Sequence, residues 1–208
     1  MEKFNSFEEA QERALTLQTG KVVTSILCFI ADNKKYSNNY FLFHSVAGHL
    51  QQLIKKNKDL WTFGNGGVYD SIEERDRALL EAYQQSVDDP QMEFDAPGHA
   101  EEYLIHHFEQ CLEQCNDQSI KDVQIYLNYS PCSGYDNKPS DGDSQNNTPS
   151  GCLGKLANLA NQHGSLEFSV IYNKDFGNVQ QIANAIGTSS EDILNGFELP
   201  HNLKVMKL

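Results

Sequence analysis

The sequence predicts one α/β domain in which helices cover both faces of a mixed five-stranded sheet. Segments rich in β-branched and aromatic residues alternate with segments of helical length, and this alternation is typical of a sheet layered with helices. A short polar turn separates the first two strand-like segments, which favours an antiparallel hairpin. Helices separate the later strand-like segments, which predicts parallel pairing through right-handed crossovers.

The N-terminal region predicts a helix followed by the hairpin. Ser6 and Glu9 have the spacing of a capping box, so a helix is expected to start at Ser6 and to end before Gly20. The next segment is dominated by β-branched and aromatic residues and predicts a buried strand. The hairpin then comprises a strand at 22–30, a polar turn at 32–39 and a returning strand at 40–46.

The region after residue 97 predicts helices that alternate with strands. Pro97 and Gly98 break the chain before a helix that is expected to run from His99 to about Cys115. The expected elements after it are strands at 123–129, 166–172 and 203–208, helices at 152–162 and 178–186, and a turn at 190–194. Because helices connect these three strands, the strands are expected to run parallel to one another.

Two irregular regions interrupt this single domain of residues 1–208. The region at about 47–97 is interpreted as a helical insertion, because amphipathic segments at 49–60 and 71–85 lie between Gly- and Pro-containing loops. The region 133–151 is polar and rich in Gly and Pro, and it is expected to be a flexible loop. This loop is either a lid that guides substrate or an insertion that the fold tolerates.

Composition limits the class of protein. A formal net charge of −13 disfavours a nucleic-acid binder, although a few local Lys or Arg residues beside a pocket can suffice. Five cysteines in 208 residues argue against a disulfide scaffold. No apolar run is long enough to cross a membrane, and the N-terminus lacks a signal-peptide core. Cytoplasmic or nuclear residence is therefore the default expectation, and secretion stays open because a removed signal peptide leaves no trace.

Four residues suggest a catalytic metal site. His99 with Cys132 and Cys152 makes a three-ligand set that suits Zn²⁺ and leaves a fourth position for water. Glu101 follows His99 by two residues, so its carboxylate can move protons without binding the metal. The alternative for His99 and Glu101 is a solvated helix start. The alternative for Cys152 is a buried helix cysteine, with another group completing the site.

The residues around this set resemble the cytidine deaminase superfamily, most closely its AID/APOBEC-like branch. The resemblance is carried by His99-Ala-Glu101, Tyr129-Ser-Pro-Cys132, Cys152 and the segment 166–176. It covers roughly residues 20–45 and 98–208. It implies the sheet expected above, and it implies deamination of cytosine to uracil in a polynucleotide, usually single-stranded DNA or RNA.

The resemblance also implies a role for each matching residue. It implies zinc ligands at His99, Cys132 and Cys152, with Glu101 as the proton shuttle. The residues that it implies for substrate binding are Ala100, Tyr129, Ser130, Tyr172 and Phe176. Among these, Tyr129 and Ser130 would line the cytosine pocket, and 172–176 would contact the base beside the target. The alternative for the three aromatic residues is ordinary burial in the core.

Two other functions stay open. A deaminase of free cytidine, deoxycytidine or tRNA adenosine keeps the chemistry, and the acidic charge favours a small substrate. The crossover before the last strand favours the polynucleotide branch, because free-nucleoside enzymes usually turn back antiparallel there. A non-enzymatic, deaminase-like zinc-binding module is suggested by the nineteen residues, 133–151, between Cys132 and Cys152. An intact Glu101 argues against that module, because a structural zinc site does not use such a carboxylate. The sequence does not predict an oligomeric state.

Overall fold

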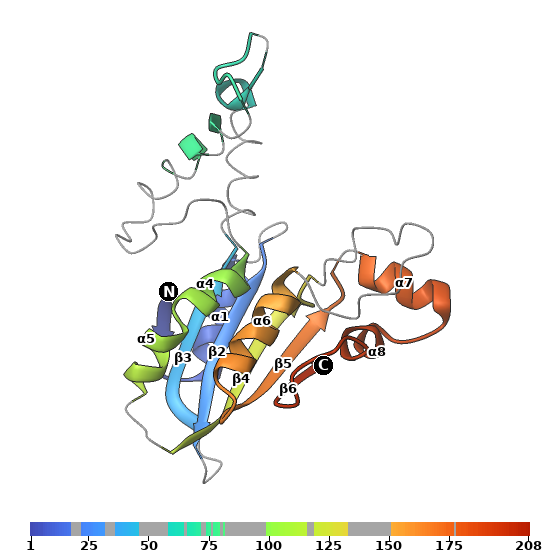
Figure 1. Cartoon of the computed structure of the whole chain (residues 1–208). Coiled ribbons are helices and arrows are strands. Elements are labelled where there is room, and N and C mark those ends of the chain that lie inside the picture. The colour runs from blue at the N-terminus through green and yellow to red at the C-terminus, as the bar shows by residue number, and fades with distance from the viewer. Residues whose placement is uncertain are drawn as a thin grey trace.

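The described part of the chain is a mixed α/β structure built on one sheet of six strands (Figure 1). The computed structural model describes residues 1–17, 22–31, 36–45, 58–64, 66–71, 74–75, 77–79, 81, 99–115, 119–132, 151–176 and 178–208. The strands are β1 (Glu2–Phe4), β2 (Thr24–Ala31), β3 (Tyr36–His44), β4 (Ile120–Tyr129), β5 (Glu167–Lys174) and β6 (Leu203–Lys207). The helices are α1 (Phe7–Leu17), α4 (Ala100–His106), α5 (Phe108–Gln114), α6 (Gly151–Gln162), α7 (Asn178–Ile186) and α8 (Ser190–Asn195), with a short 3-10 helix, η1 (Lys58–Trp61).

The strand order across the sheet is β1-β3-β2-β4-β5-β6. Strand β2 pairs antiparallel with β3 and with β4, whereas β5 runs parallel to both β4 and β6. Helix α6 connects β4 to β5, and α7 and α8 connect β5 to β6. The expected hairpin and the expected parallel crossovers are therefore both confirmed.

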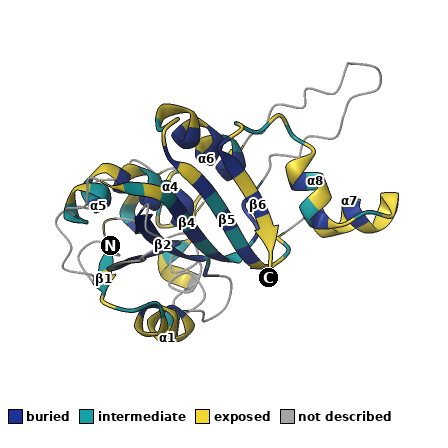
Figure 2. Ribbon diagram, turned by 90° about the horizontal axis from the view of Figure 1, so that it is seen from below, coloured by how far each residue is buried: buried dark blue, intermediate teal, exposed yellow. Residues whose placement is uncertain are grey.

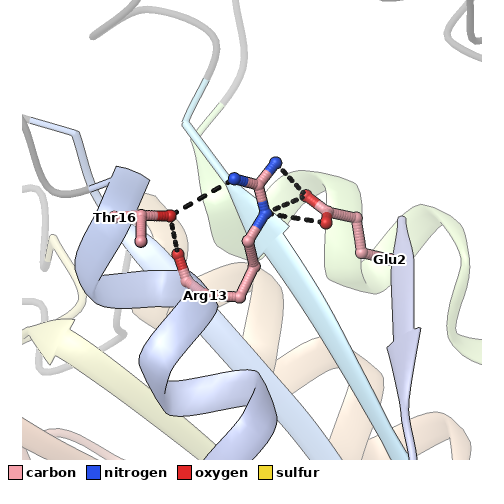
Figure 3. A network of polar contacts seen from close by, with 3 residues as sticks. All are labelled: Glu2, Arg13 and Thr16. Atoms are coloured by element: carbon pink, nitrogen blue, oxygen red, sulfur yellow. Dashed lines mark hydrogen bonds and ion pairs between the residues drawn. The ribbon is translucent and has the colours of Figure 1, made fainter.

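The expected number of five strands is wrong, because the N-terminal residues add β1 at the edge of the sheet. Residue Lys3 of β1 pairs with Phe41 of β3. Arg13 of α1 donates hydrogen bonds of 2.9–3.2 Å to the carboxylate of Glu2 and fastens the strand to the helix (Figure 3). A strand of three residues is too short to show the alternation by which strands are recognised in a sequence.

Helices cover both faces of the sheet, as expected (Figure 2). Helix α1 packs one face, where its Ala10 and Ala14 meet Ile26 and Cys28 of β2. Helices α4, α5 and α6 pack the other face, where the neighbouring residues of β2 join the larger core. Because successive side chains of a strand point to opposite faces, a strand covered on both sides is apolar throughout. This explains why every residue of β2 is buried and why its residues from Ile26 onward are all apolar.

Two boundaries differ from the sequence-based expectations. The single helix expected from His99 to about Cys115 is divided at His107, whose backbone leaves helical geometry at φ −96° and ψ 4°. At this point the buried ring of His107 stacks on Phe43 of β3. Strand β3 begins at Tyr36, inside the expected polar turn, because ladder pairing with Ile30 extends the hairpin there.

Several expectations fall on regions outside the described residues. These are most of the helices expected at 49–60 and 71–85, and the loop at 133–150. Residue 151 is described and is the first residue of α6. None of the helices within the described ranges combines the length and the apolar character needed to span a bilayer.

Candidate metal site

Three separate elements bring the expected metal ligands together. His99 caps the N-terminus of α4, Cys132 follows the end of β4, and Cys152 lies in the first turn of α6. Helices α4 and α6 pack side by side on the same face of the sheet (Figure 1). One ligand atom from each residue lies within 4.8 Å of the others, so the group could hold a metal ion.

The contacts inside the group are those of a compact site. His99 Nδ1 lies 3.2 Å from Cys152 Sγ and 3.8 Å from Cys132 Sγ. The backbone N–H of Cys152 donates a hydrogen bond of 3.1 Å to Cys132 Sγ. Ligands of a tetrahedral ion at bond lengths of 2.0–2.3 Å are separated by roughly 3.5–3.8 Å. The two distances from His99 Nδ1 are therefore already near the spacing that one shared ion requires, and the two sulfur atoms lie within 4.8 Å of each other.

Gly151 allows α6 to approach Cys132 this closely. Its φ is +60°, and a Cβ placed there would lie 2.8 Å from the carbonyl oxygen and 2.9 Å from Sγ of Cys132. The N–H of Leu153 donates a 3.0 Å hydrogen bond to that same carbonyl oxygen. The loop expected at 133–151 ends at this glycine. The available signal was a glycine directly before a candidate ligand.

The thiols and the imidazole influence one another's protonation. Hydrogen bonds, first from Cys152 and then from His99, lower the pKa of Cys132 to about 4. The pKa of Cys152 is raised, because it shares a hydrogen bond with Cys132 and is buried. The hydrogen bond with Cys132 raises the pKa of His99. Cys132 is thus the thiol of the pair that ionises more easily, and metal ligation requires the ionised form.

Glu101 is a buried carboxylate beside these ligands. Only 2% of the residue is exposed, and its Oε2 atom has no hydrogen-bond partner among the described residues. Burial raises the pKa of Glu101 to about 7. A carboxylate oxygen without a partner is costly to bury, so Oε2 of Glu101 is a candidate contact for a bound ligand.

The expected substrate-binding residues lie in two kinds of surroundings. Ala100 and Ser130 are buried, and Ser130 Oγ accepts a 2.9 Å hydrogen bond from the N–H of Phe176. Tyr129 meets Phe176 edge to face at 6.1 Å, and Lys174 Nζ lies 5.9 Å from the Tyr129 ring centre. Phe176 is 39% exposed, so this cluster reaches the surface.

Tyr172 lies elsewhere, in the main core. It is fully buried, and burial raises the pKa of its hydroxyl. It belongs to the same core cluster as Phe168 and Val170 of β5. Lys174, which pairs in register with Tyr129 across β4 and β5, is not among the residues that the sequence predicts for substrate binding. The substrate-binding roles of all these residues stay predictions.

The sequence matches no protein-family model, and no curated protein has a significant match to it.

Proposed function

We propose that the chain is a zinc-dependent hydrolytic deaminase that converts cytosine to uracil in single-stranded DNA or RNA. The observation that carries the proposal is the buried Glu101, whose Oε2 atom has no hydrogen-bond partner among the described residues, beside the group of His99, Cys132 and Cys152. Structural zinc sites usually have four protein ligands, whereas catalytic sites have three and keep an open position. Within the described residues the group has three members, and a carboxylate lies next to it.

The donor set fits zinc. One imidazole nitrogen and two thiolates are ligands that zinc binds well, and none of them favours Mg²⁺ or Ca²⁺. Zinc held by three protein ligands lowers the pKa of a bound water to about 7 and so supplies a nucleophile at neutral pH. The protein's contribution is to fix three ligands on packed helices and a strand end, and to add a proton carrier.

Glu101 is suited to be that proton carrier. Its pKa of about 7 allows the carboxylate to accept a proton at one stage and to release it at another. In the proposed reaction Glu101 takes a proton from the attacking water and delivers it to N3 of cytosine. It then transfers the remaining proton to the amino group, which leaves as ammonia. One water is consumed, and uracil and ammonia are the products.

The substrate class is supported by two further observations. Tyr129, Lys174 and Phe176 form an aromatic cluster with one cation beside the buried Ser130, and nucleobases stack on such side chains. The last strand, β6, runs parallel to β5, which is the arrangement associated with the polynucleotide branch of the family that the sequence resembles. The second candidate is a deaminase of free cytidine, which the net charge of −13 favours.

The test is uracil formation by the zinc-loaded protein. Single-stranded DNA, RNA and free cytidine are incubated separately, and uracil is quantified by mass spectrometry. We expect uracil in at least one oligonucleotide. Turnover of cytidine alone would assign the second candidate, and zinc binding without any uracil would favour a binding module.

The matched control is Glu101→Gln, which preserves shape but cannot carry the proton. We expect this variant to bind zinc and to lose roughly 10²- to 10⁴-fold in turnover, the usual contribution of a general acid–base. Activity equal to that of the unaltered protein would exclude the role given to Glu101.

A further inference from the structure

We propose that Glu102 and Lys155 form a brace that holds His99 and Cys152 at the separation needed for metal binding. The name brace refers to these two side chains together. The inference rests on the metal group of the proposed function, but it does not depend on which substrate is deaminated. It assigns a positioning role to two residues that touch neither the metal nor the substrate.

The Glu102 carboxylate joins both ligand-bearing helices. Its Oε2 atom accepts a 2.6 Å hydrogen bond from the backbone N–H of His99. Its Oε1 atom accepts a hydrogen bond from Lys155 Nζ on α6. Lys155 follows Cys152 by three residues, so the two lie one turn apart on the same helix face. A single carboxylate therefore connects one ligand's backbone to the helix of another.

The position of each ligand explains why such a connection matters. His99 is the N-cap of α4, with extended backbone angles of φ −81° and ψ 161°. The helix ladder engages its carbonyl oxygen, which accepts from the N–H groups of Glu102 and Tyr103, but it offers no partner for its N–H. Glu102 is the third residue of α4, the position from which a Glu side chain reaches back to the N-cap amide. Cys152 is likewise in the first turn of its helix. Both ligands therefore lie at the N-terminal end of a helix, and the brace connects the start of α4 to α6.

The ion pair between Glu102 and Lys155 is expected to contribute little to the stability of the fold. The side chains of Lys155 and Glu102 are 54% and 31% exposed, and ion pairs with this exposure contribute little to folding. Groups that orient metal ligands, by contrast, change metal affinity strongly when they are removed. The brace is therefore expected to act on the metal site more than on the stability of the apoprotein.

The test measures zinc affinity by competition with a chromophoric chelator, and coordination geometry by the absorption spectrum of the Co²⁺-substituted protein. We expect Glu102→Ala to weaken zinc binding by roughly ten- to hundredfold and to alter the Co²⁺ spectrum. Lys155→Met is expected to weaken zinc binding by up to about fivefold, the limit for an exposed pair. Lys155→Arg should restore the affinity of the unaltered protein.

The double variant separates a brace from two independent effects. If Lys155 acts through Glu102, then Glu102→Ala with Lys155→Met should bind zinc as Glu102→Ala alone does. Strictly additive losses would overturn the proposal, because they would mean that the two residues act separately.

The control pair is Glu2 with Arg13, which lies on the α1 side of the sheet (Figures 2 and 3). Its side chains have comparable exposure, at 38% and 44%. Arg13→Gln should leave zinc affinity and the Co²⁺ spectrum unchanged. If Glu102→Ala and Lys155→Met also leave both unchanged while the unaltered protein binds zinc, the brace is overturned. If the unaltered protein binds no zinc, the proposed metal site itself fails.

Discussion

At position 151 the space of a side chain is already occupied by Cys132. The backbone of Gly151 has a positive φ, and its missing Cβ would overlap the sulfur and the carbonyl of Cys132. Residue 151 must therefore adopt a left-handed conformation and also lie very close to a candidate ligand. Glycine alone meets both without strain.

We expect Gly151→Ala to weaken zinc binding by at least about tenfold, because α6 must move away from Cys132 to accommodate the methyl group. Gly187 provides the matched control, since its φ is +73° but nothing lies within 4 Å of an added Cβ. Gly187→Ala should cost about 1 kcal/mol of stability and leave zinc affinity unchanged. Equal zinc affinity in both variants would show that the contact with Cys132 is not required.

The buried carboxylate of Glu101 leads to a second prediction at the scale of a single residue, which concerns how stability depends on pH. In the apoprotein its pKa is about 7, against 4.5 for an ordinary glutamate. Below pH 4.5 the folded and unfolded chains both hold the proton, so burial of the charge costs nothing. As the pH rises toward 7, the unfolded chain releases its proton first and folding is penalised, by about 3 kcal/mol once both forms are ionised.

Chelator-treated Glu101→Gln should therefore be more stable than the unaltered apoprotein at pH 8, and the two should converge near pH 4. Urea unfolding at several pH values measures the difference. A difference that does not change with pH would indicate a packing effect instead of the buried charge.

At the scale of elements, α8 protects the exposed edge of the sheet. Strand β6 is the last strand, and its edge would otherwise present unpaired backbone groups. The Asn195 side chain donates to the carbonyl of Val205 at 2.8 Å and accepts from its N–H at 3.2 Å. Glu191 accepts from the N–H of Lys207 at 3.3 Å. A helix thus supplies the partners that a further strand would supply.

Asn202, which directly precedes β6, links α6 to the residue before β5 through its side chain. Its replacement provides the prediction for this scale. It is 1% exposed, and its Nδ2 donates to the carbonyls of Ala160 at 2.9 Å and Leu166 at 2.8 Å. Asn202→Ala would leave both carbonyls buried without this donor. We expect a loss of at least about 2 kcal/mol in the free energy of unfolding, measured by urea denaturation.

The matched control for Asn202 is Asn195→Ala, because Asn195 is an exposed residue of α8 and its hydrogen bonds to the carbonyls of Glu191 and Val205 are exposed and partly buried, whereas both Asn202 bonds are fully buried. This control should lose less stability than Asn202→Ala. A loss below about 0.5 kcal/mol for Asn202→Ala would contradict the assigned role.

At the scale of the whole molecule, metal binding is expected to stabilise the fold, because the ligands come from three distant segments that meet only when the chain is folded. Zinc at a thousandfold excess over its dissociation constant should add about 4 kcal/mol to the free energy of unfolding. Calorimetry with and without a chelator measures this as a lowered Tm on metal removal. An unchanged Tm would mean that folding and metal binding are not coupled.

Much of the architecture could be predicted, because strongly apolar runs and the helices between them are local signals. The sequence predicts the segments of β2, β4 and β5, the antiparallel pairing of β2 with β3, and the parallel pairing of β4, β5 and β6. The metal group could be predicted only because its residues match a known pattern. Strand β1 is too short to produce a signal, and the contact of Glu102 with Lys155 depends on how two helices pack, which no local pattern reports.

The nineteen residues between Cys132 and Cys152 have a thermodynamic consequence for the site. The zinc-deaminase pattern P-C-x-x-C has two residues between its cysteines. Closing a loop of nineteen residues instead of two costs about 2 kcal/mol more in chain entropy. A structural zinc ion contributes roughly 10–16 kcal/mol in small zinc-dependent domains, so a cross-link by metal easily outweighs that difference. The length of the spacer is therefore nearly free to vary, and shortening 133–150 by half should change zinc affinity by no more than a few fold.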